Sequence, residues 1–85
     1  MASKRTINRA YWVAVKAEAA GADHVISPAH VFKRCLQGIP DRVAVPLIKK
    51  YEDRYGPARL ADVSNKSLWQ ARDKIDAIRQ EYQRQ

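Results

Sequence analysis

The chain has 85 residues, 46% of them hydrophobic and 29% charged, a balance that excludes an intrinsically disordered protein and suits one small domain with a single core. Its 16 lysines and arginines against nine aspartates and glutamates give a net charge of +7, which favours nucleic acid, an acidic protein surface or anionic lipid as partner, unless the charge serves solubility alone. Because Cys35 is the only cysteine and no apolar run approaches the ~20 residues of a membrane span, we expect a cytoplasmic protein with neither a disulfide nor membrane contact.

The first predicted helix covers residues 6–20, with Thr6 as its N-cap and Gly21 just beyond its end. Its apolar side chains recur at helical spacing and form the expected inward face: Ile7, Ala10, Tyr11, Ala14 and Ala17. A basic stripe with a tryptophan at its centre lies opposite: Lys4, Arg5, Arg9, Trp12 and Lys16. Such a stripe can follow phosphates and offer a stacking surface, but a solvated face with Trp12 half-buried between helices explains the pattern equally.

Ser27 and Pro28 predict the start of a second helix over residues 28–37, because a hydroxyl cap followed by proline suits a helix N-terminus. Its expected inward residues are Val31, Phe32, Cys35 and Leu36. A third helix is expected over 41–55, with the inward residues Val43, Leu47, Ile48, Tyr51 and Tyr55. Pro46 removes one backbone hydrogen bond just beyond the first turn, so either the helix kinks there or its regular part begins there.

The last predicted helix covers residues 65–82 and has the clearest periodicity in the chain. Its apolar side chains alternate at spacings of three and four residues: Leu68, Ala71, Ile75, Ile78 and Tyr82. A short helical turn is expected near 57–61, and no segment has the pattern of a strand. We therefore expect an all-α fold, a small bundle of four helices plus that turn, in a single domain over residues 1–85.

Residues 58–78 contain, in order, a small residue, a turn residue, an apolar residue, a helix cap and two further apolar residues: Ala58, Asp62, Val63, Ser64, Leu68 and Ala71. This order resembles the helix-turn-helix superfamily of DNA-binding domains. Two features depart from the family's pattern. Asp62 replaces the usual glycine of the turn, and Gly56 and Pro57 shorten the first helix of the pair.

The resemblance implies a recognition helix that opens at Ser64 and presents Asn65, Lys66, Trp69, Gln70 and Asp73 outward. Asn65 and Gln70 carry the paired donor and acceptor that read adenine in the major groove. Ser64 and Lys66 would reach phosphates or base edges. The alternative is that Ser64 and Asn65 only begin a helix and Trp69 packs against the first helix.

Catalysis and metal binding have little support in the sequence. His24 and His30 have no cysteine or carboxylate at metal-ligand spacing, and Cys35 falls on an apolar helical face. No glycine-rich phosphate loop and no framed carboxylate pair occurs. We therefore expect no enzyme, no metal and no cofactor.

Two function classes remain. The first is a small basic nucleic-acid-binding protein, with DNA favoured over RNA, that uses the 57–78 segment and the basic stripe and could dimerise through Ile75, Ile78 and Tyr82. The second is a non-enzymatic protein-binding module, such as a phage-type inhibitor of host nucleic-acid machinery, that binds an acidic protein surface. Trp12, Trp69 and Tyr82 would then be the contact anchors.

Overall fold

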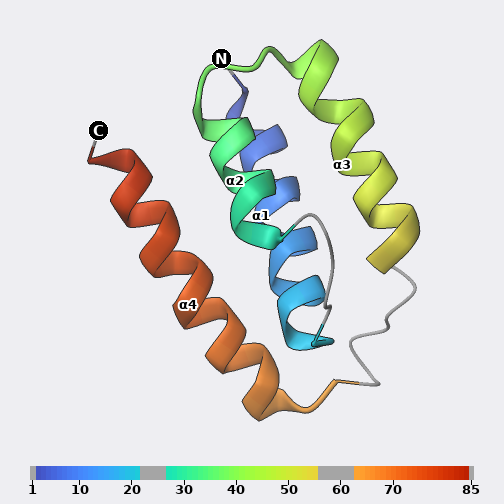
Figure 1. Ribbon diagram of the computed structural model, residues 1–85, viewed down its shortest axis with the longest axis vertical. Coiled ribbons are helices and arrows are strands. Elements are labelled where there is room, and N and C mark those ends of the chain that lie inside the picture. The colour runs from blue at the N-terminus through green and yellow to red at the C-terminus, as the bar shows by residue number, and fades with distance from the viewer. Residues whose placement is uncertain (1, 22–26, 56–62, 85) are drawn as a thin grey trace.

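Four α-helices follow one another in the chain, as expected. The computed structural model describes residues 2–21, 27–55 and 63–84, apart from the side chain of Tyr55. Within those ranges the helices are α1 (Lys4–Ala19), α2 (Pro28–Leu36), α3 (Asp41–Tyr55) and α4 (Asn65–Gln83), with no strand (Figure 1). The all-α prediction is confirmed. The short turn expected near 57–61 lies outside the described residues.

Serine side chains cap three of the helices. Ser27 and Ser64 cap α2 and α4 as predicted, each accepting a backbone N–H three residues on at 3.2 Å. The cap of α1 is Ser3, whose Oγ accepts the Thr6 N–H at 3.3 Å. The prediction that Thr6 is the cap was therefore wrong: Thr6 is buried within the helix, and its hydroxyl lies 3.0 Å from that of Ser3.

The buried face of α3 begins one residue later than predicted, at Ala44 and not at Val43. Ala44 is buried together with Ile48 and Tyr51, whereas Val43 is 46% exposed. The spacing of four and three from Ala44 keeps these side chains on one helical face, and Val43 lies about 100° away from Ala44. The helix runs from Asp41 through the exposed Pro46, so its regular part does not begin there.

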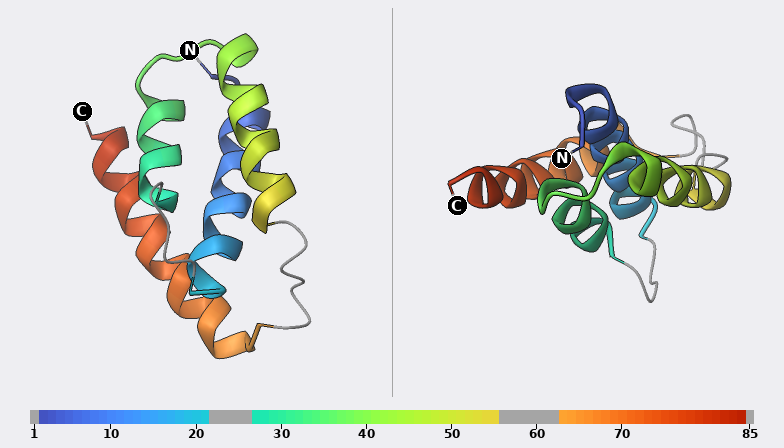
Figure 2. Two further views of the ribbon diagram at one scale, coloured as in Figure 1. Left: turned by 45° about the vertical axis from the view of Figure 1, so that its right-hand side comes forward. Right: turned by 90° about the horizontal axis from the view of Figure 1, so that it is seen from above.

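Helix α1 lies at the centre of the bundle. Figure 2 shows α3 and α4 on opposite sides of the α1–α2 pair. One buried cluster joins α1 to α2 and α3 through Ala10, Val13, Ala17, Val31, Cys35, Ala44, Ile48 and Tyr51. A second cluster joins α1 to α2 and α4 through Tyr11, Ala14, Val15, Phe32, Ala71 and Ile75. Because three helices cover α1, its buried arc also includes Val13 and Val15, which the predicted stripe omitted, and only a narrow outer face stays exposed.

No helix in the described ranges combines the length and the apolarity needed to cross a bilayer.

Candidate functional site

Two tryptophans are exposed, on different helices. Trp12 of α1 is 46% exposed and Trp69 of α4 is 60% exposed. The sequence left open whether Trp69 packs against α1. Its exposure shows that this side chain is not buried against α1. Both indoles instead line one groove of about 210 Å³ between the helices, together with Val15, Asn65, Leu68 and Arg72. The structure thus joins the two surfaces that the sequence placed on separate helices.

Each indole is held by a neighbour in its own helix. The Trp12 ring meets that of Tyr11 edge-on, with centroids 5.4 Å apart and an interplanar angle of 77°. The Arg72 guanidinium lies 5.1 Å from the centroid of Trp69, a cation–π distance. Arg72 follows Trp69 by three residues on α4, a spacing at which side chains on one helix meet. This pair could therefore have been predicted from the sequence, but the predicted site did not include Arg72.

A polar hollow of about 460 Å³ extends the groove along α1 and α4. It shares Trp12 and Arg72 with the first part, and its other lining residues are Asn8, Tyr11, Asp76, Arg79, Gln80 and Gln83. The Arg79 guanidinium lies 5.5 Å from the Tyr11 ring centroid, and Arg72 Nε lies 3.9 Å from Asp76 Oδ2. Burial, followed by the Asp76 carboxylate, raises the pKa of Tyr11 above its usual value.

The basic stripe of α1 is partly neutralised by α3. Arg9 pairs with Glu52. Lys16, Glu52 and Asp53 line the same hollow of about 410 Å³ between the two helices. No sequence pattern predicted this contact between α1 and α3. Lys4 and Arg5 are exposed and make no ion pair within the described residues.

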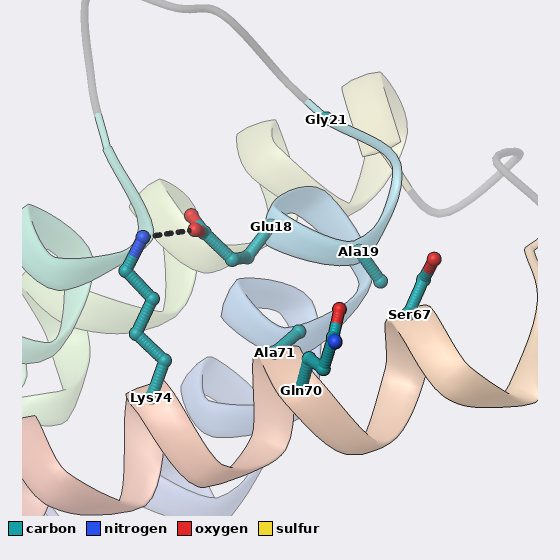
Figure 3. Close-up of a pocket in the computed structure, with 7 residues that line it drawn as sticks. All are labelled: Glu18, Ala19, Gly21, Ser67, Gln70, Ala71 and Lys74. Atoms are coloured by element: carbon teal, nitrogen blue, oxygen red, sulfur yellow. Dashed lines mark hydrogen bonds and ion pairs between the residues drawn. The ribbon is translucent and has the colours of Figure 1, made fainter.

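The predicted recognition surface is divided between the two flanks of α4. All its outward residues are exposed: Ser64, Asn65, Lys66, Trp69, Gln70 and Asp73. Asn65 and Trp69 line the groove with Trp12, but Gln70 lies elsewhere. Figure 3 shows Gln70 near the end of α1, in a cavity of about 320 Å³ beside the pair of Lys74 Nζ and Glu18 Oε1, which are 2.7 Å apart.

The Ser64 hydroxyl makes its hydrogen bonds with Ser67 of α4. Its Oγ accepts the Ser67 N–H at 3.2 Å and donates to Ser67 Oγ at 2.8 Å. These bonds begin α4 and position Asn65 and Lys66 in its first turn, and the phosphate or base-edge contact of Ser64 stays a prediction.

Cys35 and His30 do not line the groove. Cys35 is buried, and this burial, followed by the nearby charge of Asp41, raises the pKa of its thiol. His30 accepts a hydrogen bond from Arg34 Nε at 3.1 Å, while His24 lies outside the described residues. The part of the chain that the structure describes contains no group of three or more metal-ligating side chains.

No known protein family, curated protein or solved structure matches this chain. The helix-turn-helix segment begins in residues 58–62, which the structure does not describe, so the resemblance stays a prediction.

Proposed function

We propose that this protein is a non-enzymatic, cytoplasmic nucleic-acid-binding protein that binds double-stranded DNA and favours DNA over RNA. The observation that carries the proposal is the shared groove: Trp12 on α1 and Trp69 on α4 line one surface together with Asn65 and Arg72. Aromatic and amide side chains beside cations are the groups with which proteins contact bases and phosphates.

Cations lie on the two helices that form this groove. Lys66 follows Asn65 at the start of α4, and Lys16 follows Trp12 by four residues, which places it one turn further along α1. Lys66 is exposed and makes no ion pair within the residues that the structure describes. Together with Lys4 and Arg5 it supplies positive charge that attracts the DNA backbone, while Asn65 supplies a base-reading amide.

The test is binding to random-sequence duplex DNA across a salt series. About four phosphate contacts would give a plot of log affinity against log salt with a slope near −4, since each neutralised phosphate contributes about −0.9. Lys66→Ala should weaken binding and make the slope shallower by about 1. The matched control is Lys33→Ala, because Lys33 is exposed on α2 and does not line the groove between α1 and α4.

The helix-turn-helix prediction has a test of its own. The double change of Lys66 and Gln70 to alanine should weaken DNA binding without unfolding the protein, because both side chains are exposed. Unchanged affinity would show that the start of α4 is not the recognition element, and absence of DNA binding at low salt would overturn the proposed function.

A protein-binding function is the second candidate, and one observation favours it. The floor of the groove is apolar, since Val15 is buried and Leu68 half-buried between the two indoles. Tryptophan and arginine over an apolar floor are typical of the anchor residues in protein interfaces. The partner would be a protein with an acidic surface. One such partner would be a protein of the nucleic-acid machinery that this protein inhibits. Such a protein would bind no duplex DNA at low salt, which separates the two candidates.

A further inference from the structure

We propose that the groove between Trp12 and Trp69 is a stacking site for an unpaired nucleobase, so that the protein prefers nucleic acid with a single-stranded or bulged position. This inference rests on the proposed function and names the form of nucleic acid that the same surface takes. It concerns the part of the groove lined by Trp12, Val15, Asn65, Leu68, Trp69 and Arg72.

Both indoles present surface to the same groove. Both line the groove, yet no ring contact joins Trp12 to Trp69, although ring contacts join Tyr11 to Trp12 and to Phe32 in the described residues. Tyr11 supports Trp12, and Arg72 lies over Trp69, so each indole has a partner within the protein and still presents surface to the groove. Stacking on such surfaces accepts any base, because every base has a π-face.

The polar groups at this site suit a base and its phosphate. Asn65 offers an amide that both donates and accepts, which matches the mixed edge of a base. Arg72 supplies a guanidinium that stacks and carries positive charge. Among the described residues, no carboxylate lines this part of the groove, whereas the adjoining hollow has Arg72 and Arg79 beside Asp76. The charge therefore complements a phosphate backbone.

A base within a paired duplex cannot enter the groove. Both of its faces are covered by neighbouring base pairs, and only its edges are accessible in the grooves of DNA. A bulged base or a single strand has no such barrier, because its bases can be turned out and stacked on aromatic side chains. From the stacked base, the strand would continue along the polar hollow, where Arg79, Gln80 and Gln83 follow on α4.

The experiment compares three oligonucleotides at one low salt concentration: a short duplex, the same duplex with one bulged base, and one of its strands alone. We expect the bulged duplex and the strand to bind more tightly than the paired duplex. Trp69→Ala should weaken these two by roughly 5- to 150-fold and the paired duplex by much less, because stacking contributes at each unpaired base. Binding should also quench tryptophan fluorescence.

Two further variants exclude indirect effects. Trp69 is 60% exposed, so its removal leaves the core clusters intact, and Trp69→Phe should restore part of the affinity. Val43→Ala on α3 removes an exposed apolar side chain that does not line this groove, and should change nothing. Equal affinity for the three oligonucleotides, or an equal effect of Trp69→Ala on all of them, would overturn the stacking site and leave nucleic-acid binding standing. No binding to any of them would overturn both.

Discussion

Asp41 connects the start of α3 to the start of α1. Its Oδ1 accepts the Ser3 backbone N–H at 2.8 Å, and Ser3 in turn caps α1. This N–H, followed by the Ser3 hydroxyl, holds the pKa of Asp41 below its usual value. Because the pKa is lower in the folded state than in the unfolded state, the carboxylate stabilises the fold above its unfolded pKa, and this contribution is lost as the pH falls through the folded pKa.

Asp41→Asn should therefore lower the free energy of unfolding at pH 7, and the difference from the unchanged protein should shrink at a pH well below about 4, because the contribution is lost as the pH falls from the unfolded pKa through the lowered folded pKa. Urea unfolding at both pH values measures this difference. Asp73→Asn is the matched control, because Asp73 is exposed and makes no ion pair in the described parts of the chain. A difference of the same size at both pH values would show that the charge of Asp41 is not responsible.

Helix ends in this protein depend on glycine at the first residues beyond the caps of α1 and α2. Gly21 has φ +68° and Gly38 has φ +87°, both in the left-handed region that L side chains disfavour. A Cβ at either position would meet no atom within 4 Å. The requirement for glycine is therefore a matter of backbone conformation and not of space.

Gly38→Ala should lower the free energy of unfolding by about 1–2 kcal/mol, because alanine pays the steric cost of the left-handed conformation. Asparagine tolerates that conformation better, so Gly38→Asn should lower it less. Chemical denaturation of the two variants provides the measurement. If both variants lose the same stability, local crowding and not backbone conformation sets the preference for glycine.

At the scale of the whole molecule, α1 supplies residues to both core clusters and still forms the middle of the candidate surface. Its outer face lies between α4, which contributes Trp69 and Arg72, and α3, which contributes Glu52 and Asp53. One flank of this face is therefore aromatic and basic, whereas the other carries acids that offset Arg9 and Lys16. The usable positive charge of the basic stripe is therefore smaller than its number of lysines and arginines implies.

Glu52→Gln should release Arg9 and strengthen binding to duplex DNA at low salt, with a slope of log affinity against log salt steeper by up to ~0.9. The fold should lose no more than ~1 kcal/mol, because both partners of this pair are substantially exposed. The control Glu81→Gln makes the same charge change at an exposed position of α4 that lines none of the three hollows beside Trp12. Equal gains for the two variants would point to net charge alone, and not to Arg9.

The sequence by itself determined the helices. Ser27 with Pro28, the two left-handed glycines and the periodicity of α4 each act through hydrogen bonds or side chains a few residues apart, so a local pattern was enough to predict them. The prediction from sequence was wrong where two nearby residues could fill the same role. Ser3 and Thr6 both offer a capping hydroxyl, and Val43 and Ala44 are both apolar, so their neighbours in α1 and α3 decided which was used.

Only the tertiary structure decided which predicted site residues meet. It placed Trp12 beside Asn65 and Trp69, separated Gln70 from them, and paired Arg9 with Glu52 across 43 residues of sequence. These contacts follow from how α1 packs against three helices at once, and that packing sets the rotation of each helix about its own axis. A helical period shows which residues share a face, but the facing helix determines what that face meets.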